Sequence, residues 1–160
     1  VAEGVDACEG AVEVMRLRGV NARQCSMWDL TALSHYRTLV LLMNTVGSVG
    51  SVAGLRSLLE RLHSATAPDC HVLLDISTPD WASVLAAANR RADPFRSFRE
   101  NRWVVLQCWL TFGGLAGQTF PLLFVEQEAV LKVAKATGWH AELVIKDEES
   151  QQALLQLRKV

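Results

Sequence analysis

Apolar side chains recur at helical spacing in four stretches of the chain, and they predict helices over 9–18, 55–62, 81–91 and 126–137. The first helix has arginines in its last turn and is followed by Gly19, and the fourth is followed by Gly138. Glycine just past a helix is a common stop signal. The second helix places its leucines on one face: Leu55, Leu58, Leu59 and Leu62.

Unbroken apolar runs between these helices indicate strands. The run at 38–43 lacks alternation, which is typical of a parallel strand covered on both faces, and 71–76 is another candidate for a central strand. A weaker strand is expected at 20–27, and another ends at Val5 and Asp6. The segment 44–54, rich in glycine, serine and threonine, is predicted to be a loop.

The second half of the chain departs from simple alternation. Strands are expected at 103–112 and 118–125, and the glycines between them predict an inserted β-hairpin near 103–125. A strand follows at 139–145, and 153–160 forms either a strand or a helix. Strands that alternate with helices predict right-handed crossovers, with helices on both faces of the sheet. We therefore expect residues 1–160 to form a single α/β domain.

Composition excludes several functions. Sixteen basic residues against 17 acidic ones give a net charge of −1, which does not favour binding to nucleic acid or to an anionic membrane. A basic stretch at 90–102 is more typical of a solvated helix face. The apolar runs are shorter than the roughly 20 residues that a membrane helix needs. The four cysteines lie far apart, so we expect a reduced, soluble, cytoplasmic protein.

Familiar catalytic signatures are missing from the sequence. The four histidines do not cluster and no Cys-x-x-Cys pair occurs, so no metal site is expected. No G-x-S-x-G motif is present, so a hydrolase triad has no support. Aromatic residues in the predicted hairpin form either a lid over a substrate or half-buried core.

The order of several landmarks resembles that of the class I S-adenosylmethionine-dependent methyltransferases. Val5-Asp6-Ala7-Cys8 and the helix after it are similar to the family's second strand, its acidic tip and the next helix. Trp28-Asp29-Leu30 and the apolar run to Asn44 are similar to the exit of the third strand and to the fourth strand. Pro68-Asp69-Cys70 precedes the expected fifth strand, and Gly138-Trp139-His140 resembles the start of the sixth.

This resemblance implies a Rossmann-like sheet that is mostly parallel, with an antiparallel C-terminal strand. It also implies S-adenosylmethionine (SAM) as cofactor and methyl transfer to a small-molecule acceptor. Two departures stand out: Asp69-Cys70 replaces the usual pair of glycines, and no glycine-rich loop after a first strand is present. We therefore expect that an N-terminal segment is missing or that another chain supplies a strand, with a strand-exchanged homodimer as a further expectation.

The resemblance also assigns the cofactor-binding residues. Asp6 is expected to accept the ribose hydroxyls, with Ala7 and Cys8 against the adenine; alternatively, Asp6 only caps the helix that follows. Ser26 stands where many relatives have an acid near the adenine, and Met27 and Trp28 form either an apolar wall for the base or ordinary core.

Met43 and Asn44 end the expected fourth strand, where relatives contact the cofactor. Asn44 forms either a polar anchor there or the start of a turn. Methyl transfer is an in-line displacement in which positioning can do most of the work, and no general base can be named. The alternatives are a non-catalytic Rossmann-like module for binding or assembly and, with less support, an NAD-linked dehydrogenase.

Overall fold

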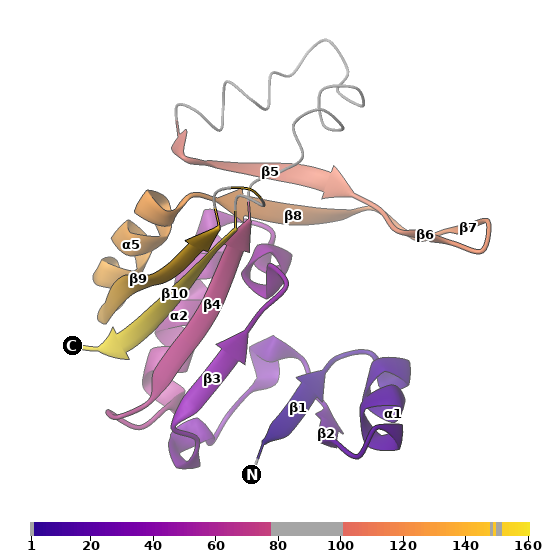
Figure 1. Ribbon diagram of the computed structural model, residues 1–160, viewed down its shortest axis with the longest axis horizontal. Helices are drawn as coiled ribbons and strands as arrows, with labels where there is room; N and C mark the ends of the chain where they lie inside the picture. Colours follow the sequence, from indigo (N-terminus) through magenta and orange to yellow (C-terminus); the bar gives the residue numbers. More distant parts are fainter. Residues whose placement is uncertain (1, 78–100, 148, 150–151) are drawn as a thin grey trace.

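The larger sheet of the protein has four strands. The computed structural model describes residues 2–77, 101–147, 149 and 152–160. Strand order is β3 (Thr38–Leu41), β4 (His71–Ser77), β10 (Gln152–Lys159) and β9 (Trp139–Asp147), as Figure 1 shows. β3 and β4 are parallel, whereas β10 runs antiparallel to both of its neighbours. The C-terminal segment, which the sequence left open between strand and helix, is therefore a strand.

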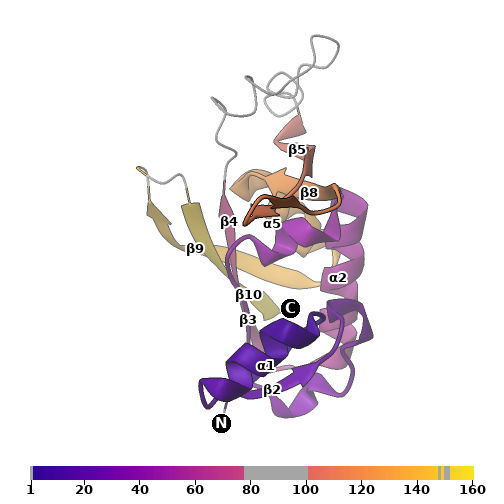
Figure 2. The same ribbon diagram turned by 90° about the vertical axis from the view of Figure 1, so that its right-hand side faces the viewer.

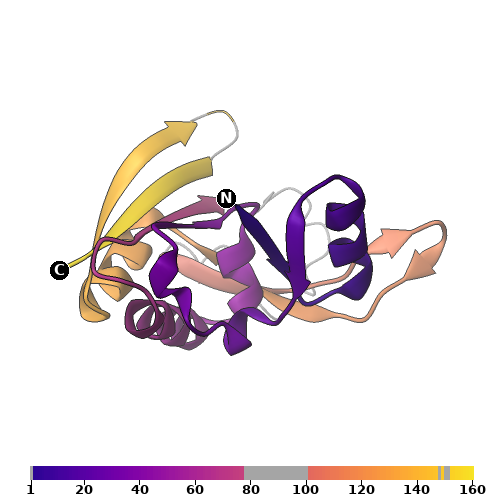
Figure 3. The ribbon, with the colours of Figure 1, turned by 90° about the horizontal axis from the view of Figure 1, so that it is seen from below.

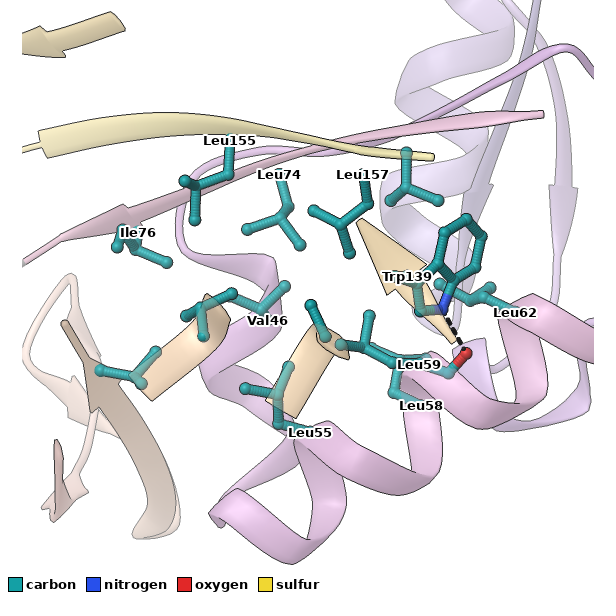
Figure 4. Packing of buried hydrophobic residues seen from close by; sticks show 14 of the residues in the cluster. Val46, Leu55, Leu58, Leu59, Leu62, Leu74, Ile76, Trp139, Leu155 and Leu157 are labelled. Carbon is teal, nitrogen blue, oxygen red and sulfur yellow. Dashed lines mark hydrogen bonds between the residues drawn. The ribbon is translucent and has the colours of Figure 1, made fainter. Parts of the chain in front are cut away.

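The core lies between this sheet and two helices, α2 (Val52–Ala65) and α5 (Gln127–Ala136). The four leucines of α2 are buried and face Leu74, Leu155 and Leu157 of the sheet (Figure 4). At the start of β9 the buried Trp139 donates a 3.0 Å hydrogen bond from Nε1 to the carbonyl oxygen of Leu59. The leucines that recur at helical spacing in the sequence thus form one continuous apolar layer with the sheet residues.

A smaller unit stands beside the four-stranded sheet. β1 (Glu3–Asp6) and β2 (Asn21–Gln24) are parallel and are connected by α1 (Glu9–Leu17), which packs against both (Figure 2). Figure 3 shows this unit from below, with α1 on the far side of its two strands from the larger sheet. β1 and β3 point the same way, but among the described residues no backbone ladder joins them.

A long insertion separates β4 from α5. β5 (Trp103–Cys108) pairs antiparallel with β8 (Phe120–Val125), and β6 (Thr111–Phe112) pairs with β7 (Leu115–Ala116) at the tip. The tip extends away from the rest of the chain in Figure 1, and Phe112 is 89% exposed. The predicted helix at 81–91, and most of the basic connector that follows it, lie outside the described residues.

Three details differ from the sequence predictions. β3 is covered on one face only, because the side chain of Val40 is 57% exposed while Leu39 and Leu41 pack against the core. The segment 44–54 contains a short 3₁₀ helix, η3 (Thr45–Val49), and the first residues of α2. α2 and α5 both pack against the same face of the four-stranded sheet, so the described helices do not cover both of its faces.

Candidate functional site

The predicted site residues follow the carboxyl ends of three parallel strands. Asp6, Ala7 and Cys8 follow β1, Ser26 to Trp28 follow β2, and Met43 and Asn44 follow β3. The three strands point the same way, so these segments lie along one edge of the molecule. In open α/β sheets, ligands bind outside the carboxyl ends of the strands.

The carboxylate of Asp6 is held in place by the turn that follows it. Its Oδ1 accepts a 2.7 Å hydrogen bond from the backbone N–H of Cys8, the N-cap residue of α1. Among the described residues no hydrogen bond or ion pair engages Oδ2, and Ala7 and Cys8 are exposed. Asp6 does not cap α1, because Cys8 is the N-cap residue and the bond of Asp6 is to the N–H of Cys8 rather than to an N–H of the first helical turn. One carboxylate oxygen of Asp6 is left for a ligand.

Two hydrogen bonds join the ends of β1 and β2. The N–H of Cys25 donates to the carbonyl oxygen of Asp6 at 2.9 Å, one step beyond the last strand pair. The side-chain amide of Gln24 donates to the carbonyl oxygen of Ala7 at 3.0 Å. The segment after β1 therefore lies beside the segment after β2 at Asp6–Cys25 and Ala7–Gln24.

Ser26, Met27 and Trp28 have different environments in the short 3₁₀ helix η1 (Met27–Asp29). Ser26 caps this helix, since its Oγ accepts a 3.2 Å hydrogen bond from the N–H of Trp28. Met27 packs against the core, which favours the core interpretation for that side chain. Trp28 is 37% exposed, and Arg61 of α2 donates to its carbonyl oxygen. Only the indole of Trp28 is thus placed as a candidate wall for a base.

The end of β3 has an uncommon backbone. Met43 and Asn44 have φ values of 62° and 53°, in the left-handed region that residues other than glycine seldom adopt. Each such residue costs roughly 1–2 kcal/mol relative to a right-handed conformation. Both N–H groups point at Asp75 of β4: Met43 donates to Oδ2 at 2.9 Å and Asn44 donates to Oδ1 at 2.7 Å. The carboxylate thus offsets the strain.

The side chain of Asn44 faces the interior of the loop. Its Nδ2 lies 3.5 Å from the carbonyl oxygen of Leu123 in β8, and its Oδ1 is buried without a hydrogen-bond partner. It also lies directly under Gly47, where an added Cβ would come within 2.5 Å of Nδ2. Asn44 is the N-cap residue of η3, as the turn interpretation predicted, and its carbonyl oxygen accepts a 2.8 Å hydrogen bond from the N–H of Gly47. The exposed group at this strand end is the side chain of Met43, which is 92% exposed.

Asp75 is the residue that sequence reasoning missed at this edge. A signal was present, because a lone carboxylate inside an apolar strand is uncommon unless it has partners. Its partners could not be inferred, since they are backbone groups 31 and 32 residues away in the chain. Among the described residues no hydrogen bond or ion pair joins the Met43–Asn44 end to Asp6 or Ser26.

A hollow of about 520 Å³ lies between the end of β4 and the start of α5, and none of the predicted site residues after β1, β2 or β3 is among its lining residues. Ser77, Glu126 and Lys146 are among its lining residues. Pockets for small molecules commonly have volumes of about 300–1,000 Å³.

In the part of the chain that the structure describes, no group of three or more His, Cys, Asp or Glu side chains could hold a metal ion. No described helix has the length and apolarity needed to cross a membrane.

Comparison with known proteins relates the fold to one enzyme class. No family model matches the sequence, and no curated protein matches it. Among solved structures, a SAM-dependent methyltransferase from Bacteroides fragilis in complex with S-adenosyl-L-homocysteine (SAH) superposes with a TM-score of 0.73 at 24% identity. The match covers 98% of this chain and 62% of that one.

Two further structures agree. The CcbJ methyltransferase from Streptomyces caelestis has a TM-score of 0.63 at 14% identity, over 99% of this chain and 74% of that one. A SAM-bound amino pentose methyltransferase from Micromonospora echinaspora, involved in calicheamicin biosynthesis, has a TM-score of 0.63 at 15% identity. That match covers 99% of this chain and 73% of the other. The chain therefore has the class I fold of the SAM-dependent methyltransferases.

Proposed function

We propose that this chain binds SAM along the edge formed by Asp6, Ser26 and Met43–Asn44 and transfers its methyl group to a small-molecule acceptor. The proposal combines the fold with the placement of the predicted residues at the carboxyl ends of parallel strands. Solved structures with this fold include complexes with SAM and with SAH.

The observation that carries the proposal is the state of the Asp6 carboxylate. A bond to the N–H of Cys8 fixes its orientation, and its second oxygen faces no described donor. A carboxylate fixed in this way after a parallel strand can accept ribose hydroxyls without the cost of ordering its side chain. Hydrogen bonds join the ends of β1 and β2, and this supports an adenine site formed with Ser26 and the partly exposed Trp28, which follow β2.

The chemistry asks little of the protein beyond positioning. The sulfonium sulfur of SAM is the leaving group, and the acceptor atom attacks the methyl carbon in line with the bond that breaks. The hollow near Ser77, at the end of β4, has a volume suited to a small acceptor.

The four cysteines are all free thiols, which supports a reducing compartment such as the cytoplasm.

Calorimetric titration tests the proposal. SAH is titrated into the chain, with NAD as the comparison ligand, because an acidic residue after a strand also occurs in NAD-binding sheets. Saturable binding of SAH without binding of NAD supports the proposal. Binding of NAD alone would favour the dehydrogenase.

A chain that includes whatever the gene encodes upstream of Val1 is titrated in parallel. If SAH binds only to this longer chain, the proposed cofactor stands and binding needs further residues. If neither chain binds SAH, the proposal fails and the non-catalytic binding module becomes the better interpretation.

A further inference from the structure

We propose that Asp75 is a positioning residue that sets the cofactor-facing backbone at Met43–Asn44, an inference that rests on the proposed function. Asp75 does not touch the cofactor in this proposal. It acts through the two N–H groups that it accepts, one on each carboxylate oxygen.

The geometry is that of an anion bound by successive backbone N–H groups. Consecutive N–H groups in a turn can form a concave nest that binds an anion. Here the anion is part of the chain: the Asp75 carboxylate lies 2.9 Å from the nitrogen of Met43 and 2.7 Å from that of Asn44. Charge-assisted hydrogen bonds are stronger than neutral ones, so a neutral side chain at position 75 would hold this turn less well.

Asp75 lies on a rigid element. Its neighbours Leu74 and Ile76 point into the core from the opposite face of β4, and β4 is paired on both sides, with β3 and with β10. Strand alternation therefore places the Asp75 side chain on the face away from α2 and α5. Because Asp75 is held by a central strand, its two hydrogen bonds keep the Met43–Asn44 turn in a conformation that it would otherwise not favour.

The same turn is anchored on its other side by η3. The side chain of Asn44 is enclosed under Gly47, next to the carbonyl oxygen of Leu123. The backbone of Asn44 is held as well: its N–H donates to Asp75, and its carbonyl oxygen accepts a 2.8 Å hydrogen bond from the N–H of Gly47. Loss of the Asp75 carboxylate should therefore change the conformation of the turn that carries the exposed Met43 side chain.

The first test uses NMR on the unliganded chain. An amide proton bonded to a carboxylate resonates downfield, so the Met43 and Asn44 amides should shift upfield in Asp75→Asn, which keeps the size of the side chain. The control is Asp69→Asn, since Asp69 is exposed and pairs only with Arg37 at the opposite end of β4. Unchanged Met43 and Asn44 amides in Asp75→Asn would overturn the inference, whether or not the chain binds SAH.

The second test asks whether the hydrogen bonds of Asp75 affect the binding of SAH. Asp75→Asn should weaken SAH binding about tenfold, the effect expected from losing a charged hydrogen bond, while Asp69→Asn should bind as the original chain does. In Asp75→Ala, sodium formate should restore part of the affinity by filling the empty nest, and sodium chloride at the same ionic strength should not. Equal affinities in all variants would overturn the positioning role.

The two failures can be told apart. If neither the original chain nor the longer one binds SAH, the proposed function fails and the positioning role fails with it, even if the amide shifts occur. If the chain binds SAH and formate restores nothing in a folded Asp75→Ala protein, only the inference about Asp75 fails. Melting curves of each variant establish that the protein is folded before titration.

Discussion

The phenolic hydroxyl of Tyr36 donates a hydrogen bond to the carboxylate of Glu3. Glu3 is the first residue of β1, and Tyr36 lies just before β3, so this contact joins the two separate sheets at the end opposite the candidate site. Arg23 of β2 adds an ion pair to Glu3 at 3.3 Å. The hydrogen bond from Tyr36, followed by that from Arg23, lowers the pKa of Glu3, and the bond to Glu3 raises the pKa of Tyr36.

Glu3 should therefore make stability depend on acid pH. Because its pKa is lower in the folded state, the ionised carboxylate stabilises the fold above its ordinary pKa of 4.5, and this contribution is lost as the pH falls through the folded value. Glu3→Gln should melt at a lower temperature than the original chain at pH 7, and the difference should shrink below pH 4.5.

Thermal melts between neutral and acidic pH, followed by circular dichroism, measure this difference. Glu13→Gln is the matched control, because Glu13 is exposed on α1 and forms no ion pair with another described residue. A gap between Glu3→Gln and the original chain that stays constant with pH would contradict the prediction.

Trp139 should be among the most sensitive core positions. Its ring is 1% exposed, and its Nε1 is bonded to Leu59, so Trp139→Phe loses both a hydrogen bond and buried volume. We expect a loss of about 2–3 kcal/mol in the free energy of unfolding, measured by urea titration. Trp109→Phe, at a 55% exposed position of the insertion, should change it by no more than about 0.5 kcal/mol. Equal losses in the two variants would contradict this account.

Lys159 should stabilise the C-terminal end of α2. Its Nζ donates to the carbonyl oxygens of His63 and Thr66, and a cation there also interacts favourably with the helix dipole. Lys159→Met should lower the free energy of unfolding by about 1–2 kcal/mol. Lys132→Met breaks an exposed ion pair to Glu128 on α5 and should cost about 0.5 kcal/mol or less. The same urea titration compares them, and a larger loss in Lys132→Met would exclude the capping role.

The elements that the sequence predicted well are those with one dominant periodicity. α2 was predictable because its leucines are the side chains that the sheet buries, and α1 ends where Gly19 adopts a φ of 78°. β4 was predictable from the apolar residues around Asp75, Val72 to Leu74 and Ile76. The unbroken apolar run of β3 was misleading about coverage, because an apolar pattern does not say which face has a neighbour, and Val40 remains exposed.

The candidate site was less predictable, because its contacts are between backbone and side chain over long separations. The positions of Asp6 and Asn44 at strand ends follow from the pattern, and asparagine tolerates the left-handed region, but nothing in the sequence indicates the left-handed backbone at Met43. The bonds of Asp75 depend on the register between β3 and β4, which pairs Leu41 with Leu74. Register is fixed by packing across the whole sheet, so local sequence could not reveal it.

Among the described residues, β1 and β3 each have one edge that pairs with no other strand, so a homodimer remains a prediction. Exposed strand edges can pair with another chain. Light scattering after size exclusion should therefore show a dimer, and the fraction of dimer should rise with protein concentration. Val40→Lys places a charge on β3 and should shift the chain toward monomer. Val144→Lys does the same on β9, the other end of the sheet, and should leave the dimer intact. A monomer at every concentration, or loss of the dimer only in Val144→Lys, would contradict pairing through β3.

Asp6 should determine the affinity for SAH without contributing to stability. If its free oxygen binds a ribose hydroxyl, Asp6→Asn should weaken SAH binding about tenfold or more in calorimetry, since a hydrogen bond to a charged acceptor is lost. The melting temperature should change little, because Asn can still accept the N–H of Cys8. Asp29→Asn is the matched control: Asp29 is exposed in η1, one residue beyond Trp28, and its loss should leave the affinity unchanged. If Asp6→Asn binds SAH as tightly as the original chain, Asp6 serves only the turn into α1, and the ribose site must lie elsewhere.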